Sequence, residues 1–174
     1  MDVSALKAKI QTKNIPSYLI FTGDEWKIQE IYIQQIAKAL EKDIRRVDTL
    51  QEVYDSLRSK SFIKTSYIYV IRDSKELMQN EKVQQQISAG ILKENVLIHL
   101  ITNIDKRTKF YKQYTNDIIV FERLSDTLLR KYILKEINLS ERNIKRLIAI
   151  CEHDYGRILL EIDKIRRYAD VCND

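Results

Sequence analysis

Short apolar runs alternate with amphipathic segments along the first two thirds of the chain. The apolar runs lie at 18–22, 44–48, 66–71, 96–102 and 118–121, and each has the length of a strand rather than of a helix. Runs that are apolar at successive positions are typical of strands covered on both faces. This alternation predicts an α/β fold with a five-stranded, mostly parallel sheet flanked by helices.

The longest predicted helix follows Gly23 and runs to about Lys42. Apolar residues recur along it at intervals of three and four, which predicts one buried stripe. This stripe consists of Ile28, Ile31, Tyr32, Ile36 and Leu40. Shorter helices are predicted at 4–13, at 50–60 and before Gly90, the first of which ends ahead of Pro16.

After Arg123 the pattern becomes helical only. Ser125 and Ser140 are expected to cap two helices, and a third begins after 154–156. Their inward residues are expected to include Leu128, Leu129, Tyr132, Ile133, Ile137, Ile144, Leu147, Ile148, Cys151, Ile158, Leu159, Ile162 and Ile165. We therefore predict an α/β domain at 1–123 and a small three-helix domain at 124–174.

The stretch Y-L-I-F-T-G-D-E-W-K-I-Q-E at 18–30 reads as a strand that passes through one glycine into a helix. Unpaired N–H groups at a helix N-terminus make such a turn a natural phosphate site. A P-loop continues from its first glycine to a second glycine, a lysine and a Ser or Thr. Here those positions hold Ile28, Gln29 and Glu30, and the acidic residues Asp24 and Glu25 would repel a triphosphate.

The third strand also lacks the acidic pair with which an ATPase holds magnesium and orients water. It ends in Ile71-Arg72-Asp73-Ser74, where Asp73 is expected to cap the next helical turn. We therefore expect no catalysis, no metal and no bound cofactor. The function is expected to lie on the surface of the protein.

Composition is that of an ordinary globular protein, with 32% charged and 44% hydrophobic residues among 174. No apolar run approaches the roughly 20 residues needed to cross a bilayer, and residues 1–9 contain no signal-peptide core, so we expect a cytoplasmic protein. The two cysteines and two histidines show no disulfide framework and no metal-ligand spacing. Cys151 and His99 are expected to be core residues.

The net charge of +5 is compatible with a polyanionic partner, although 30 cations against 25 anions describe a mixed surface. The densest positive segment is predicted to be a helix that contains Lys106, Arg107, Lys109 and Lys112, with Phe110 and Tyr111 interleaved. One interpretation is contact with nucleic acid. The alternative is that the aromatic residues pack in the core while the cations are simply hydrated.

The loop before the third strand contains the apolar pair Phe62 and Ile63 after Ser61. An apolar pair is unusual in a loop between a helix and a strand. From residue type alone it can either tuck beneath the sheet edge or be exposed for a partner.

Together these features are similar to an AAA+ module without ATPase function, which has a degenerate P-loop domain and a three-helix lid. The order of the motifs resembles the delta subunit of the bacterial DNA polymerase III clamp loader. The resembling stretches are Y-L-I-F-T-G-D-E at 18–25, Y-I-Y-V-I-R-D at 67–73, V-L-I-H-L-I-T-N-I-D-K-R-T-K at 96–109, F-E-R-L-S at 121–125 and Y-G-R-I-L-L-E-I-D-K-I-R-R-Y at 155–168. The resemblance covers nearly the whole chain and rests on order and spacing rather than on one motif.

The resemblance implies a subunit that binds the ring-shaped sliding clamp, the beta subunit, and opens it without hydrolysing ATP. The family's hydrophobic wedge matches Ser61, Phe62 and Ile63, although the family commonly has leucine where this chain has Ser61. Primed DNA would contact the basic segment only within an assembled loader. The alternative is another ATPase-dead loader paralogue that acts as a structural stator, with Phe62 buried.

Delta subunits also continue into a C-terminal collar domain that joins the other loader subunits, whereas this chain stops at Asp174. We expect either a fragment or a natural short form.

Overall fold

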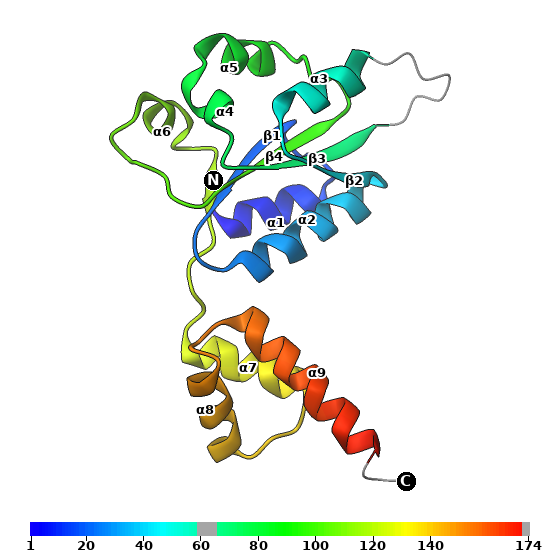
Figure 1. Cartoon of the computed structure of the whole chain (residues 1–174), viewed down its shortest axis with the longest axis vertical. Coiled ribbons are helices and arrows are strands. Elements are labelled where there is room, and N and C mark those ends of the chain that lie inside the picture. Colours follow the sequence, from blue (N-terminus) through cyan, green and yellow to red (C-terminus); the bar gives the residue numbers. More distant parts are fainter. Residues whose placement is uncertain (59–65, 172–174) are drawn as a thin grey trace. The chain divides into compact units, whose positions relative to one another are not determined.

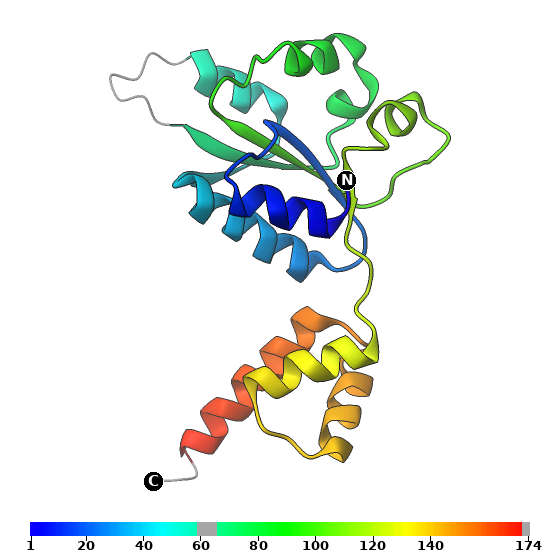
Figure 2. The same ribbon diagram turned by 180° about the vertical axis from the view of Figure 1, so that it is seen from behind.

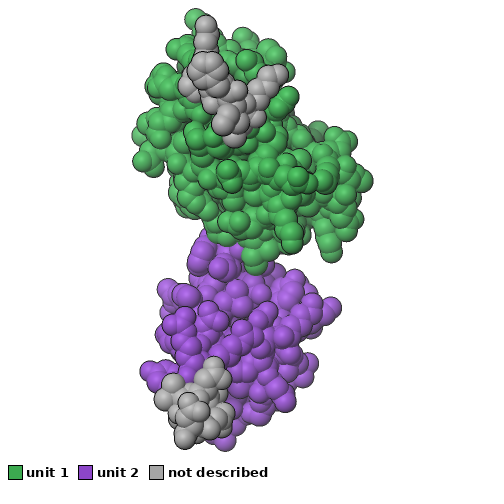
Figure 3. Space-filling view, turned by 90° about the vertical axis from the view of Figure 1, so that its right-hand side faces the viewer, with its two compact units in different colours: residues 1–23, 29–121 green, residues 24–28, 122–174 purple. Residues whose placement is uncertain are grey.

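The computed structural model of the chain describes residues 1–58 and 66–171. The chain divides into two compact units, coloured separately in Figure 3. The first unit contains residues 1–23 and 29–121, and the second contains residues 24–28 and 122–174. The short segment at 24–28 thus belongs to the second unit, although residues 26–28 are the first residues of the helix α2 (Trp26–Leu40), whose remaining residues belong to the first unit.

Within the described residues of the first unit, five strands form one parallel sheet in the order β2-β3-β4-β1-β5. The strands are β1 (Tyr18–Thr22), β2 (Asp43–Val47), β3 (Tyr67–Arg72), β4 (Val96–Ile101) and β5 (Ile118–Val120). The helices between and before them are α1 (Val3–Gln11), α2 (Trp26–Leu40), α3 (Leu50–Arg58), α4 (Lys75–Gln79), α5 (Glu81–Ser88) and α6 (Lys109–Tyr114). The predicted five-stranded α/β fold is confirmed.

Helices cover both faces of this sheet, as Figures 1 and 2 show, with α1 and α2 on one side and α3, α4 and α5 on the other. The second side has a core of residues from α3, β3, α4, α5, the turn after α5 and β4, namely Leu50, Val53, Tyr69, Ile71, Leu77, Val83, Ile87, Leu92 and Leu97. All six residues of β4 are buried. Coverage on both faces explains why the central strands are apolar at nearly every position, with His99 of β4 as an exception.

The buried stripe of α2 differs from the predicted one. Ile36 is buried as expected, but the other fully buried apolar position is Ile33, and Ile28 and Ile31 are only half-buried. Two overlapping stripes are available on this helix because apolar residues occupy more than one face. The helix uses the stripe that includes Gln29, whose amide finds a hydrogen-bond partner inside the protein.

In the second unit, α7 (Asp126–Glu136), α8 (Glu141–Ile150) and α9 (Tyr155–Val171) form a small bundle. The Ser125 and Ser140 hydroxyls accept from Leu128 N and Asn143 N, which confirms both predicted caps. The core consists of Leu129, Ile133, Ile144, Leu147, Ile148, Cys151, Tyr155, Ile158 and Ile162. Leu128 was expected to face inward but is 42% exposed, because the core-facing side of α7 runs through Leu129 and Ile133.

Within residues 1–58 and 66–171, no helix is both long enough and apolar enough to span a bilayer.

Candidate functional site

The glycine after β1 is required by a close approach of two backbone segments. Gly23 has a φ of +107°, and a Cβ built on it would lie 2.3 Å from the carbonyl oxygen of Phe121. Phe121 follows β5, and its N–H donates to the Thr22 carbonyl at 2.8 Å. This glycine is therefore explained by the packing of β1 against the end of β5, without a phosphate.

Two positions of this turn correspond to the lysine and the hydroxyl residue of a P-loop. Their side chains form bonds with other groups of the protein. Gln29 stands at the lysine position, is buried, and donates from Nε2 to the Gly23 carbonyl at 3.0 Å. Glu30 stands at the hydroxyl position and pairs its Oε2 with Nη2 of Arg46 at 2.5 Å. The sequence shows that the lysine is missing, but a glutamine in a helix gives no signal of the bond that replaces it.

Two of the first N–H groups of α2 are also bonded locally. Trp26 N donates to the Asp24 carbonyl and Ile28 N donates to the Glu25 carbonyl, both at 3.1 Å. An anion at a helix N-terminus needs such N–H groups unpaired. These local bonds reduce the number of donors that this turn can offer to a phosphate.

Glu25 is part of the interior of the second unit. It is only 3% exposed, and its Oε1 accepts from Leu124 N at 3.1 Å. Burial raises the pKa of Glu25, and the Leu124 hydrogen bond lowers it by a smaller amount. From the sequence, Glu25 is expected to repel a phosphate. In the structure it is a buried hydrogen-bond acceptor that holds the first residues of the 122–174 segment.

Trp26 packs against Gly156 near the start of α9, again within the second unit. A Cβ built on Gly156 would lie 2.4 Å from Cζ2 of the Trp26 indole. A side chain at position 156 would therefore displace the ring. The sequence could not reveal this pairing, because the two residues are distant along the chain and lie in separate motifs.

Gly156→Ala is expected to destabilise the second unit by about 1 kcal/mol, because displacement of the ring outweighs alanine's better helix propensity. Trp26 is the only tryptophan in the chain, so its fluorescence emission is expected to shift in this variant. Gly90→Ala is the control for the emission shift, because nothing lies within 4 Å of a Cβ at Gly90 and the substitution therefore displaces no ring. Unchanged emission in Gly156→Ala would contradict the contact.

In the junction after β3, Asp73 does not have the role predicted for it, which was to cap the next helical turn. Ser74, not Asp73, caps α4, because its hydroxyl accepts from Leu77 N at 3.4 Å. Asp73 instead accepts from Thr102, with Oδ1 bonded to the backbone N–H and Oδ2 to the hydroxyl, both at 2.7 Å. Asp73 has a φ of +46°, which turns its carboxylate toward the end of β4 rather than along α4.

The prediction that His99 and Cys151 are core residues is confirmed, because they are 0% and 3% exposed. Among the described residues, no three His, Cys, Asp or Glu side chains cluster in a way that could hold a metal ion.

The basic segment is exposed, but only part of it is helical. The predicted helix began at Lys106, whereas α6 begins at Lys109 because Thr108 provides its N-cap. Phe110 and Tyr114 are buried and Tyr111 is half-buried, so the aromatic residues of this segment pack in the core, as the second of the two interpretations expected.

Two of the four candidate cations in this segment are paired. Arg107 makes two 3.1 Å contacts with the Asp105 carboxylate, and Lys109 lies 3.4 Å from Glu81. None of the ion pairs between described residues involves Lys106 or Lys112. These two lysines are therefore the ones in this segment best placed to meet a polyanion.

The candidate wedge, Ser61, Phe62 and Ile63, lies outside the described residues. The elements on either side of it are α3, which ends at Arg58, and β3, which starts at Tyr67. They are joined by the Tyr69 hydroxyl, which donates to Ser56 Oγ at 2.7 Å, and Arg45 stacks 3.6 Å above the Tyr67 ring.

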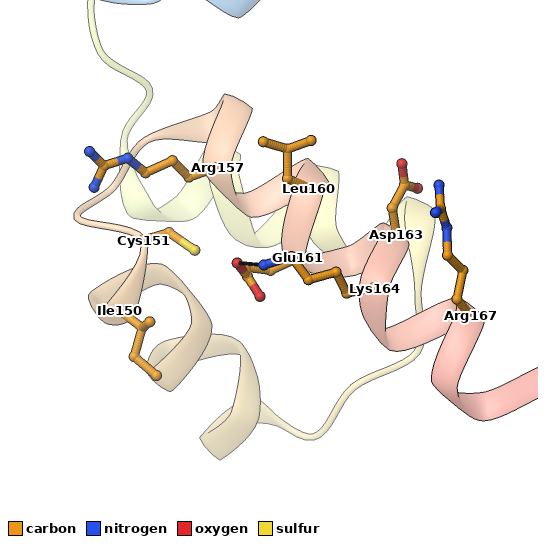
Figure 4. Close-up of a pocket in the computed structure, with 8 residues that line it drawn as sticks. All are labelled: Ile150, Cys151, Arg157, Leu160, Glu161, Asp163, Lys164 and Arg167. Carbon is orange, nitrogen blue, oxygen red and sulfur yellow. Dashed lines mark hydrogen bonds and ion pairs between the residues drawn. The ribbon is translucent and has the colours of Figure 1, made fainter. Parts of the chain in front are cut away.

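A cleft of about 480 Å³ lies beside α9 in the second unit (Figure 4). It is lined by Ile150, Cys151, Arg157, Leu160, Glu161, Asp163, Lys164 and Arg167. Glu161 and Lys164 pair with each other at 2.6 Å, and Figure 4 shows Leu160, Asp163 and Arg167 on one side of α9. The polar groups of the cleft do not converge on one point, as they would around a small-molecule ligand.

No family model matches the sequence, and no curated protein matches it. Among solved structures, the chain is similar to the DNA clamp loader delta protein YqeN of Bacillus subtilis. The TM-score is 0.59 and the identity 11%, over 96% of this chain and 57% of that one. It is also similar to Trip13 from Rhizobiales, with a TM-score of 0.53 and 14% identity over 86% of this chain and 63% of that one.

This chain thus spans less than two thirds of the length of either neighbour. At this level of identity the similarity shows a shared fold. The resemblance to the clamp-loader delta subunit is confirmed at that level, because the chain shares the fold of the delta protein over 96% of its length.

Proposed function

We propose that this chain is a delta-like clamp-loader subunit that binds the sliding clamp and opens it without hydrolysing ATP. The observation that carries the proposal is the fold shared with a clamp loader delta protein over 96% of the chain. The contacts of the glycine turn add support, because the P-loop lysine position holds a buried glutamine bonded to Gly23. A subunit of this kind works through a surface that binds a partner.

The proposed clamp contact is Ser61, Phe62 and Ile63. A short apolar wedge suits this task because a few buried aromatic or aliphatic side chains carry most of the binding energy of an interface. The elements that flank it are tied together through Tyr69 and Ser56, which provides a firm base on both sides. The other loader subunits are proposed as further partners.

The direct test is binding of the purified chain to the sliding clamp of its own source, measured by calorimetry or surface plasmon resonance. Saturable binding supports the proposal. If the folded chain shows no binding at roughly 100 μM clamp, corresponding to a free energy weaker than about −5.5 kcal/mol, clamp binding is refuted. The stator alternative then predicts assembly with other loader subunits instead.

ATP binding separates this proposal from an enzymatic one. We expect no heat of ATP binding, with or without magnesium, because the turn after β1 has neither the lysine nor the hydroxyl. Saturable ATP binding that depends on magnesium would contradict the assignment of a non-catalytic subunit.

Contact with DNA is proposed as auxiliary and dependent on Lys106 and Lys112. In a loader assembled with primed DNA, replacing both lysines with alanine is expected to weaken DNA binding and to reduce the salt slope, log K against log[salt], by about 2. Replacing Arg107 and Lys109 is the matched control, because both are paired with carboxylates of the chain. Equal slopes in wild type and the Lys106/Lys112 variant would show that these lysines do not meet phosphates.

A further inference from the structure

The junction between β3 and α4 is fastened to β4 by two titratable side chains. Asp73 takes both of its bonds from Thr102, and Asp73 N donates to the Leu100 carbonyl at 2.8 Å. One residue later, Ser74 N donates to Nε2 of His99 at 3.1 Å. The two side chains therefore hold consecutive residues of the same turn against one strand.

The hydrogen bonds of the His99 ring define its tautomer, that is, which ring nitrogen carries the hydrogen. Because Nε2 accepts a hydrogen bond from Ser74 N–H, it carries no hydrogen, and the hydrogen of the neutral ring must be on Nδ1. Nδ1 lies 3.2 Å from the Tyr18 hydroxyl of β1, which can accept it. A protonated ring would place an N–H on Nε2, directly opposite the N–H of Ser74, and would break that bond.

We propose that the pair Asp73 and His99 is an acid-sensitive clasp that holds the β3–α4 junction to the sheet. Asp73 accepts two hydrogen bonds from Thr102, and His99 accepts one from Ser74. A proton added to Nε2 of His99 removes the acceptor of the Ser74 N–H and so opens that point of the clasp. Release would begin at Ser74, whose hydroxyl also caps α4.

The surroundings of His99 offer little to stabilise a charged ring. Tyr18 faces it from β1, with Tyr114 of α6 beyond, and Phe110 of α6 lies 6.2 Å away, centroid to centroid. The Asp73 carboxylate is the one anion among the described residues that acts on the ring electrostatically. Burial lowers the pKa of His99 from 6.5 to about 4, and Asp73 opposes this by a smaller amount.

The sign of the effect follows from this lowered pKa. The neutral ring is favoured in the closed junction, so the contribution of His99 is fully present above pH 6.5 and is lost as pH falls toward about 4. If the open junction gives His99 its ordinary pKa, the opening equilibrium at pH 5 is expected to be about 30-fold larger than at pH 7.5.

Amide hydrogen exchange resolved by residue tests the clasp. After correction for intrinsic exchange rates, the opening equilibria of the Ser74 and Thr102 amides are expected to be about 30-fold larger at pH 5 than at pH 7.5. The Ile20 and Ile98 amides are expected to stay more strongly protected. His99→Gln is expected to flatten this dependence, whereas His153→Gln, which replaces the other histidine of the chain, keeps it. An unchanged pH dependence in His99→Gln, or equal protection of Ser74 and Ile20 at every pH, would overturn the proposal.

A measurement on the wild type keeps the test valid if His99→Gln does not fold. The imidazole ¹⁵N resonances of His99 are expected to show the Nδ1–H form at neutral pH and to titrate with a midpoint near 4. The Nε2–H form, or a midpoint near 6.5, refutes the clasp.

Discussion

Replacing Phe62 with alanine is expected to weaken binding to the sliding clamp by about 30- to 1,000-fold, which corresponds to about 2–4 kcal/mol. The reason is that an aromatic side chain buried in a pocket of the partner transfers a large apolar area out of water. Titration calorimetry with the clamp measures the affinity, and circular dichroism before each titration checks that the variant is folded.

Two further variants make this measurement decisive. Ser61→Leu is expected to tighten binding, because it supplies the apolar residue common at this position in the delta family, and a gain cannot result from misfolding. Ile150→Ala is the matched control, since Ile150 is 66% exposed on α8. Equal affinities of the wild type and Phe62→Ala would place the clamp contact elsewhere, and an equal loss in Ile150→Ala would show a non-specific effect.

Replacing Gly23 with alanine is expected to reduce the free energy of unfolding by about 3–5 kcal/mol, a large share of the stability of a typical domain. The added Cβ would lie 2.3 Å, 2.8 Å and 2.9 Å from the O, C and N atoms of Phe121. These are backbone atoms, so no side-chain rotation relieves the clash. The φ of +107° adds strain of its own, because L-residues with a Cβ rarely adopt it.

Gly90→Ala separates the two causes. Gly90 also has a positive φ, of +83°, but nothing lies within 4 Å of its Cβ position. Gly90→Ala is therefore expected to reduce the free energy of unfolding only through conformational strain, by about 1 kcal/mol. Urea denaturation of the wild type and both variants measures the difference. Similar losses in the two variants would contradict the close approach of Gly23 to Phe121.

These experiments bear on one view of the molecule, in which the glycine turn of a nucleotide-binding fold is kept for packing. Gly23 allows the end of β1 to approach Phe121, Gln29 satisfies the Gly23 carbonyl, and Glu25 is buried among residues of the second unit. Each residue of the turn has a structural role without a ligand. The positions that meet a phosphate in a P-loop are therefore those where substitution in this chain should affect stability rather than catalysis.

The sequence by itself determined the strands, most helices and the missing P-loop residues. Strands covered on both faces are apolar at nearly every position, and β1 and β4 accordingly stand out as apolar runs in which only Thr22 and His99 are polar. The serine caps at Ser125 and Ser140 were also readable, because a cap is a local hydrogen bond within one turn. The P-loop needs a fixed spacing along the chain, so its absence was visible from Ile28, Gln29 and Glu30 alone.

Only the tertiary structure decided which of two apolar stripes of α2 is buried, and which residues meet across the fold. The Gln29 bond to Gly23, the Trp26 contact with Gly156 and the His99 bond to Ser74 give no sequence signal. Their partners are set by how strands and helices pack, and any polar or aromatic side chain of suitable length could occupy the same positions. Local patterns specify elements because their interactions are short in sequence, whereas long-range contacts exist only once the elements have packed.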